Sequence, residues 1–178
     1  MPNFMIKLYI GGIMQKIDLN GIKVVIFDFD DTLAIHRDKD FDIHRNESED
    51  KRLGYYLNAY QNQDSFYDEI EPCDKSEIVY TFINDLRKKN IKIYCLSGMK
   101  FSFHFNAKQN FINKYYGNDI ELISVGNQKL KLDGIKIIQR INNCELNEIL
   151  FIEDLEDTID YLKSYGINVI NVNNLNSN

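Results

Sequence analysis

The stretch that decides the fold spans residues 22–33 and reads IKVVIFDFDDTL. Its first half is almost entirely apolar and rich in β-branched side chains, which is typical of a short strand buried on both faces of a parallel sheet. Acids follow at Asp28, Asp30 and Asp31. Because side chains alternate along an extended chain, Asp28 and Asp30 are expected on the same side, where their carboxylates would repel each other.

A cation held by these carboxylates would relieve the repulsion, and ligands usually bind at the carboxyl ends of strands in open α/β sheets. Mg²⁺ suits a site that offers a few carboxylates together with water and phosphate oxygens. A plainer interpretation is that the acids only end the strand and cap a helix, as Asp often does. A trio of acids directly after an apolar run favours the metal site.

Four more short apolar runs follow, at residues 91–96, 120–125, 149–152 and 167–170. Between them the apolar residues recur at helical spacing, which predicts helices at about residues 74–89, 103–116, 133–141 and 156–165. Strands that alternate with helices predict an α/β fold with a Rossmann-like parallel sheet of about five strands and flanking helices.

Residues 34–73 interrupt this alternation and predict a small helical insertion after the first strand. The insertion is highly charged at first and then rich in tyrosine. One helical face would carry Leu53, Tyr56, Leu57 and Tyr60. Such tyrosines could stack on a base or a sugar, but packing is the commoner reason for this spacing. The segment is too long for a plain loop and too short for a domain.

Composition limits the classes of function. The chain has 178 residues, and 21 Lys and Arg against 27 Asp and Glu give a net charge of −6, which disfavours a protein that grips nucleic acid through its phosphates. Its three cysteines, Cys73, Cys95 and Cys144, show no metal-binding spacing and are expected to be reduced thiols in a cytoplasm.

The N-terminal segment is apolar but short. Residues 4–13 cannot span a bilayer and lack the flanks of a signal peptide, so no membrane partner is expected. We predict one domain over residues 1–178, in which residues 1–13 form a leader or an edge strand. Translation could equally start at Met14.

The acidic stretch resembles the first motif of the haloacid dehalogenase-like (HAD) hydrolase superfamily. The family's other motifs follow in order: Ser97-Gly98 after the second apolar run, Lys129 ahead of a predicted helix, and Glu153-Asp154 after the fourth run. Lys131 competes with Lys129 for the third motif. The resemblance covers residues 22 to about 172.

The resemblance implies a Mg²⁺-dependent phosphomonoester hydrolase. Asp28 would be the nucleophile that forms an aspartyl-phosphate. Asp30 would protonate the leaving oxygen and then deprotonate water, with its backbone carbonyl on the metal. Asp154 would complete the metal site with Asp28, and Glu153 would either bind the metal or support its ligands. Since haloacid dehalogenases proper lack an acid at the position of Asp30, phosphoryl chemistry is favoured over carbon–halogen chemistry.

The remaining motif residues would bind the phosphoryl group. The Ser97 hydroxyl and the backbone N–H of Gly98 would hold a phosphoryl oxygen, and Lys129 would neutralise charge on the phosphoryl group and the nucleophile. Thr32 is expected at the substrate as well. The substrate is expected to be a phosphorylated small molecule. A phosphotransferase, a nucleotide or polynucleotide phosphatase and a non-catalytic phospho-ligand or partner-binding module would share the same motifs.

Two features stay open in the sequence. Many relatives carry a further acid at the position of Thr158, whereas this chain has Asp157, for which helix capping or support of the metal ligands is the favoured role. The family often places its cap in the insertion after the first motif. At residues 34–73 this insertion is small, which predicts a flap and a minimal cap over an open site. The chain's three histidines are expected on the surface or the flap, and His36 is the one nearest to the site in sequence. The three are His36, His44 and His104.

Overall fold

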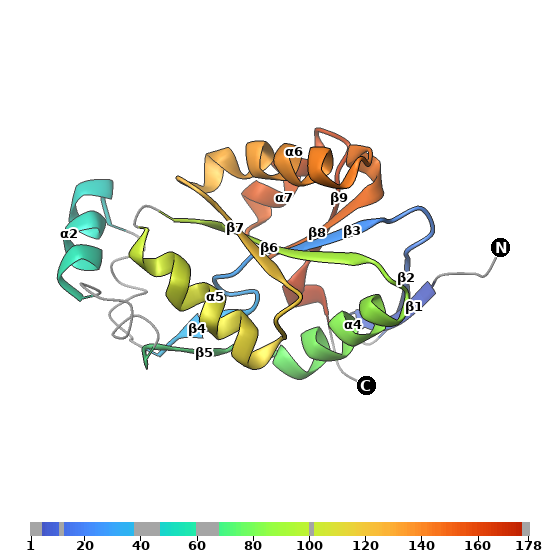
Figure 1. Cartoon of the computed structure of the whole chain (residues 1–178), viewed down its shortest axis with the longest axis horizontal. Coiled ribbons are helices and arrows are strands. Elements are labelled where there is room, and N and C mark those ends of the chain that lie inside the picture. Colours follow the sequence, from blue (N-terminus) through green and yellow to red (C-terminus); the bar gives the residue numbers. More distant parts are fainter. Residues whose placement is uncertain (1–4, 11–12, 38–46, 60–67, 100–101, 176–178) are drawn as a thin grey trace.

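The computed structural model describes residues 5–10, 13–37, 47–59, 68–99 and 102–175. Its centre is a parallel sheet of five strands in the order β7-β6-β3-β8-β9 (Figure 1). The strands are β3 (Val24–Phe27), β6 (Lys92–Gly98), β7 (Glu121–Val125), β8 (Ile149–Glu153) and β9 (Asn168–Asn171). They match the five apolar runs, so the predicted fold class is confirmed.

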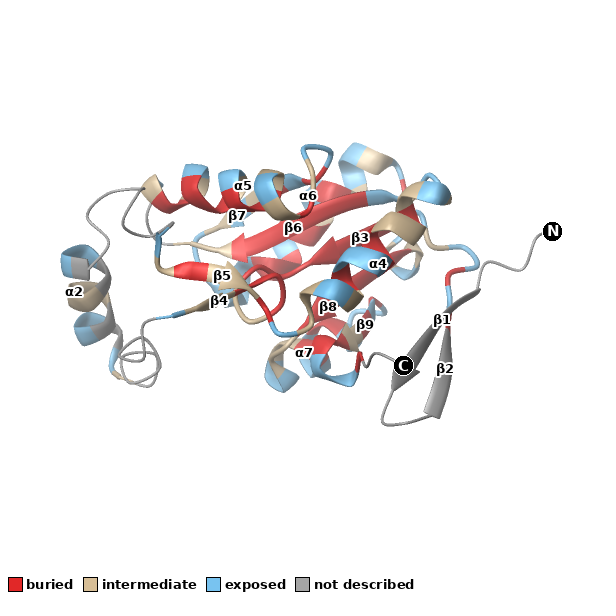
Figure 2. Ribbon diagram, turned by 90° about the horizontal axis from the view of Figure 1, so that it is seen from below, coloured by how far each residue is buried: buried red, intermediate tan, exposed pale blue. Residues whose placement is uncertain are grey.

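Helices cover both faces of this sheet (Figure 1). The four that follow the sheet strands are α4 (Ser76–Lys88), α5 (Phe103–Tyr115), α6 (Lys131–Asn142) and α7 (Glu156–Lys163). The buried side chains of α4 and α5 form one core cluster with Val25 and Phe27, and those of α6 and α7 form another with Val24 and Ile26. Strand β3 is therefore buried on both faces, as its unbroken apolar run predicts (Figure 2).

The described chain also contains short 3₁₀ turns and two pairs of antiparallel strands outside the central sheet. The turns are η1 (Gln128–Leu130), η2 (Leu146–Glu148) and η3 (Val172–Asn174). Strands β1 (Met5–Ile10) and β2 (Ile13–Asp18) pair only with each other, so the predicted leader segment does not extend the five-stranded sheet in the described residues. No helix among the described residues is long and apolar enough to cross a membrane.

The insertion after β3 contains the second antiparallel pair of strands and a helix. Strands β4 (Ala34–His36) and β5 (Ile70–Pro72) pair in antiparallel fashion, and α2 (Glu49–Ala59) lies between them in the chain. Both lie toward the carboxyl end of the sheet (Figures 1 and 2). Tyr55 packs against the core, whereas Leu57 is exposed. His44, Tyr60 and the side chain of Tyr56 lie outside the described residues.

Candidate functional site

The three central strands bring the predicted motifs together. Strand β3 lies between β6 and β8, and the chain crosses from one side of it to the other, which makes its carboxyl end the switch point of the sheet. Asp28 follows β3 directly, Ser97 is the residue before the last one of β6, and Glu153 ends β8. All three side chains are buried, with exposed fractions of 2% or less.

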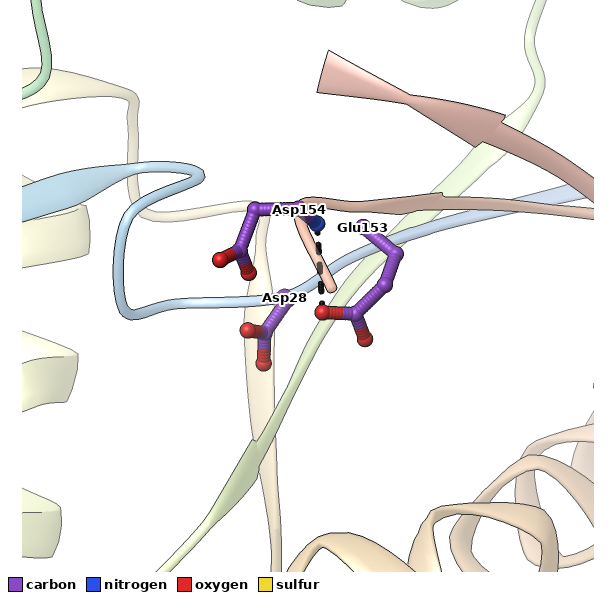
Figure 3. Close-up of side chains that lie close together, drawn as sticks. All are labelled: Asp28, Glu153 and Asp154. Atoms are coloured by element: carbon purple, nitrogen blue, oxygen red, sulfur yellow. Dashed lines mark hydrogen bonds between the residues drawn. The ribbon is translucent and has the colours of Figure 1, made fainter. Parts of the chain in front are cut away.

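Three acids converge at this edge (Figure 3). Asp28, Glu153 and Asp154 each offer an oxygen, and these atoms all lie within 4.8 Å of one another, close enough to bind one metal ion. The two oxygens of Glu153 already have partners: Oε2 accepts a hydrogen bond from Lys131, while Oε1 accepts from the backbone N–H groups of Asp154 and Leu155. Asp28 and Asp154 are therefore better placed than Glu153 to hold a metal.

The Asp28 carboxyl lies in an unfavourable place for a lone negative charge. Burial raises its pKa from an ordinary 3.8 to about 7, and the nearby charges of Glu153 and Asp30 contribute to the rise. Lys131 opposes this shift, because its Nζ lies 2.9 Å from Asp28 Oδ1. The contact is an ion pair that lacks the geometry of a hydrogen bond. A divalent cation at this carboxylate would stabilise its ionised form, so the residues present fit a metal.

The lysine beside Asp28 is Lys131. It opens α6, it is fully buried, and its Nζ lies 2.9 Å from Asp28 Oδ1 and 2.6 Å from Glu153 Oε2. Lys129 lies in η1 and is exposed. Residues two apart in a helical turn face different directions, and of the two lysines Lys131 is the one that contacts the acids. The structure thus places Lys131, the competitor of Lys129 for the third motif, beside the acids and leaves Lys129 exposed.

Two glycines allow the elements that carry Lys131 to approach the strands. A Cβ at Gly134, one turn after Lys131, would lie 2.6 Å from the Leu96 side chain, so with a larger residue there either that side chain or α6 would have to shift. A Cβ at Gly98 would come within 3.1 Å of the backbone of Asn127. Gly98 therefore has a packing role at the loop that precedes η1, beside the expected role of its N–H group.

Asp30 projects from a tight turn after β3. Asp31 takes a left-handed conformation with φ of 57°, and its N–H donates to the carbonyl of Ala34. The Asp30 carboxylate accepts a hydrogen bond of 2.6 Å from Lys108 and lies 3.6 Å from His36 Nε2. Burial alone would raise the pKa of Asp30, but Lys108 and His36 outweigh it and hold the pKa far below its ordinary value.

Lys108 is a site residue that the sequence analysis missed. It lies on α5, its side chain is 3% exposed, and its Nζ donates to both Asp30 Oδ2 and Ser97 Oγ, at 2.6 and 2.9 Å. The signal was present in the helical spacing, because Lys108 shares the buried face of α5 with His104 and Phe111. Because most lysines are exposed, a lysine at such a position does not stand out in the sequence alone.

The other predicted residues are placed as follows. Thr32 is fully buried, and its hydroxyl makes no hydrogen bond to the described residues. His36 lies on β4 within the predicted flap, and its side chain is 4% exposed. His104 lies on α5 and is only 6% exposed, so the expected surface position is wrong for this residue. Asp157 is exposed in the first turn of α7 and is absent from the group of acids that could bind a metal, which agrees with a role at the helix terminus.

No protein-family model and no curated protein matches this chain. Solved structures do. A HAD-like family hydrolase from Streptococcus pneumoniae superposes with a TM-score of 0.60 at 12% identity, covering 84% of each chain. A HAD family enzyme from Bacteroides thetaiotaomicron, solved as a magnesium complex, gives 0.58 at 14% identity and covers 85% of this chain and 93% of the other.

A third match is a HAD family hydrolase from Deinococcus radiodurans with bound phosphate and sodium, with a TM-score of 0.55 at 10% identity over 85% of this chain and 80% of the other. At these identities the likeness is one of fold. The chain thus has the α/β fold of HAD-like hydrolases, which confirms the resemblance inferred from the motifs at the level of architecture.

Proposed function

We propose that this protein is a phosphatase of the HAD-like type that hydrolyses phosphate monoesters with the help of Mg²⁺. The observation that carries the proposal is the surroundings of Asp28. A buried carboxylate at the switch point of the sheet lies against a buried lysine, Lys131, and beside a second acid, Asp154, that can share a metal ion with it. A second carboxylate, Asp30, follows two residues later.

The metal would be held by Asp28, Asp154 and the backbone carbonyl of Asp30, and it would neutralise negative charge on the phosphoryl oxygens and the nucleophile. Both oxygens of Glu153 are engaged, so this residue would act by fixing Lys131. The magnesium and the phosphate found with two structural neighbours agree with this choice of ligand. Carboxylate and carbonyl oxygens are also the donors that Mg²⁺ prefers.

The chemistry would take two steps. A carboxylate oxygen of Asp28 attacks phosphorus while the bond to the leaving oxygen breaks and Asp30 gives that oxygen a proton. Water then attacks the phosphorus of the aspartyl-phosphate while Asp30 takes the water's proton. The bond from phosphorus to the Asp28 oxygen breaks, which restores the carboxylate and releases inorganic phosphate. The structure favours ionised Asp30, the base of the second step. For the first step Asp30 must carry a proton, so its pairing with Lys108 must loosen when substrate binds.

Other residues would position the phosphoryl group. The Ser97 hydroxyl at the end of β6 is buried beside Asp30 through their shared partner Lys108, which suits it to bind a phosphoryl oxygen. Lys131 would balance charge on Asp28 and on the phosphoryl group. We infer further that the described part of the insertion, α2 with the β4–β5 hairpin, forms a flap and a small cap, so that the substrate is selected by few contacts.

The test is hydrolysis of p-nitrophenyl phosphate with Mg²⁺, by the wild type and by Asp28→Asn. We expect Asp28→Asn to lower kcat by at least about a thousandfold, since it removes the nucleophile but preserves shape. Asp31→Asn is the matched control, because it makes the same substitution three residues away and Asn tolerates the left-handed conformation of Asp31. Removal of Mg²⁺ by a chelator should also abolish turnover, and added Mg²⁺ should restore it.

Turnover that survives both Asp28→Asn and the chelator would overturn this mechanism. A wild type that binds phosphate with Mg²⁺ but never turns over would favour a non-catalytic phospho-ligand module instead. Phosphoryl transfer to an added alcohol, at the expense of release of inorganic phosphate, would indicate a phosphotransferase. Asp154→Asn sharpens the result, because loss of one metal ligand should raise the Mg²⁺ concentration that gives half-maximal activity by at least about tenfold.

A further inference from the structure

The site contains a second buried lysine that the proposed two-step reaction does not use. Lys108 comes from α5, on the face of the sheet opposite α6, the helix that supplies Lys131. Its ammonium donates to Asp30 Oδ2 and Ser97 Oγ and lies 4.5 Å from the centre of the Phe29 ring. The two lysines contact different acids, Lys131 reaching Asp28 and Glu153 while Lys108 reaches Asp30.

Stability alone is a weak reason for this burial. Taking an ammonium group out of water costs several kcal/mol, and a well-packed apolar residue in place of a buried ion pair is often as stable or more stable. Lys108 is 2% exposed, on a helix face otherwise made of residues such as Ala107, Phe111 and Ile112. An apolar side chain would fit that face, so a charge kept there points to a functional use.

The position of the ammonium indicates that use. Ser97 would bind a phosphoryl oxygen and Asp30 would face the leaving oxygen, and Lys108 Nζ is within 2.9 Å of both side chains. An oxygen that accepts from Ser97 on the side facing Asp30 would lie within reach of the same ammonium. Lys131 approaches the phosphoryl group from the side of Asp28, so the two ammonium groups would face it from different sides.

The local charge supports a need for both cations. The charged side chains around the site are Asp28, Asp30, Glu153, Asp154, Lys108 and Lys131. Four carboxylates and two ammonium groups leave a formal charge of −2, which one divalent cation would neutralise. Without Lys108 the site would face a phosphate dianion with excess negative charge even when a metal is bound, and such a charge repels the substrate.

We propose that Lys108 is a second phosphoryl-binding cation, which contacts the phosphoryl group of the substrate from the side of Ser97 and Asp30 while Lys131 contacts it from the side of Asp28. The inference rests on the proposed function for the identity of the bound group. The rival explanation is that Lys108 acts only through Asp30, by setting the position of that carboxyl group.

The experiment compares Lys108→Met, which removes the charge and keeps much of the length, with Lys108→Arg, which keeps the charge. Lys108→Gln is a second neutral variant in case Lys108→Met does not fold. Lys114→Met on the exposed side of the same helix is the matched control. Thermal unfolding confirms that each variant folds. Two readouts follow: the affinity for inorganic phosphate with Mg²⁺ by calorimetry, and kcat/KM for an aryl and an alkyl phosphate.

We expect Lys108→Met to weaken phosphate binding by about 10–100-fold, the usual worth of a hydrogen bond to a charged group. It should lower kcat/KM by a similar factor for both substrates, because both present the same phosphoryl group. Lys108→Arg should recover part of the loss, and Lys114→Met should match the wild type in both readouts.

Unchanged phosphate affinity in folded Lys108→Met or Lys108→Gln would overturn the proposal. So would a loss of kcat/KM confined to the alkyl phosphate, whose poor leaving group depends most on Asp30, since this pattern belongs to a residue that acts through the acid. Failure of the proposed function gives a different result: the wild type then shows no turnover, while calorimetry still reports whether Lys108 binds phosphate.

Discussion

The two carboxyl groups at the centre of the site, Asp28 and Asp30, lie in opposite electrostatic surroundings. In the half around Asp28, which we call the nucleophile half after the role proposed for this residue, Asp28 is 2% exposed, and burial raises its pKa to about 7 despite contact with Lys131. In the acid half, two residues further along the chain, Lys108 and His36 outweigh burial and hold the pKa of Asp30 far below its ordinary value. Each carboxylate has a buried lysine as partner, yet their pKa values move in opposite directions.

The difference lies in how many negative charges share each lysine. Lys131 contacts both Asp28 and Glu153, and Asp154 lies nearby, so one ammonium group is close to three carboxyl groups. Lys108 has one carboxylate, which also has His36 beside it. The nucleophile half therefore lacks positive charge, which a metal ion would supply, and the acid half has it already. This contrast supports the proposal that the metal is bound by the side chain of Asp28 and not by the side chain of Asp30.

The largest test of the contrast is Lys131→Met. It removes the only cation that contacts Asp28 among the described residues and leaves two buried acids beside each other. We expect kcat to fall by at least about a thousandfold, and the free energy of unfolding to fall by about 3 kcal/mol as a buried pair loses one partner. Steady-state kinetics and urea unfolding measure the two effects.

Lys129→Met is the control for this prediction, because Lys129 is exposed in the turn before α6. We expect it to keep wild-type kcat and stability. The opposite ranking, with Lys129→Met inactive and Lys131→Met active, would show that the sequence-based preference was right and that the buried lysine is structural.

Asp30→Asn tests the acid half and should have the next largest effect. Loss of a general acid and base typically costs about 10²–10⁴-fold in rate. With p-nitrophenyl phosphate the leaving group needs little help, so the first step should stay fast while attack by water becomes slow. Stopped-flow absorbance should then show a burst of p-nitrophenol close to one per enzyme, the signature of an accumulating covalent intermediate.

Asp31→Asn again serves as the control and should show steady turnover without that burst. If Asp30→Asn slows release of p-nitrophenol from the first turnover onward, by the same factor as steady-state turnover, the two halves do not divide the work as proposed. Asp30 would then be needed to bind the substrate or to position Asp28.

The same contrast explains which parts of the fold and of the site could be predicted from the sequence. The strands and helices were predictable because apolar runs and helical spacing are local patterns, and the acids that end β3 and β8 lie within such patterns. The choice between Lys129 and Lys131 was not, because it depends on where the short turn η1 ends and α6 begins. Such boundaries depend on packing in the folded protein, which local sequence patterns do not specify.

The acid half was harder to predict, because its partners come from distant parts of the chain. Lys108 lies 78 residues from Asp30. The burial of His36 depends on the pairing of β4 with β5, across the whole insertion. Lysine and histidine on a helix or a flap are usually exposed, so composition favours the wrong environment for both. Helical phase could have flagged Lys108, since it shares the buried face of α5, but its contacts required the fold.

The smallest predicted effect concerns His104, which lies at the start of α5 near the acid half. Burial lowers its pKa to about 4 from an ordinary 6.5; Lys108 and His36 add to the fall, while Asp30 opposes it. The unfolded chain thus binds a proton on His104 at a higher pH than the folded protein does. Folding is then favoured less as pH falls below the unfolded value, and from pH 7 to pH 5 this residue should cost about 2 kcal/mol of stability.

Urea unfolding of wild type and His104→Gln at pH 7 and pH 5 measures this cost. We expect the wild type to lose about 2 kcal/mol more than His104→Gln between the two pH values, because the variant has no ionisable group at this position. The comparison isolates His104 from the carboxylates, which titrate in both proteins. Equal losses would mean that His104 accepts its proton as readily in the folded state as in the unfolded chain. Neither burial nor the nearby charge of Lys108 would then disfavour the protonated histidine in the folded protein.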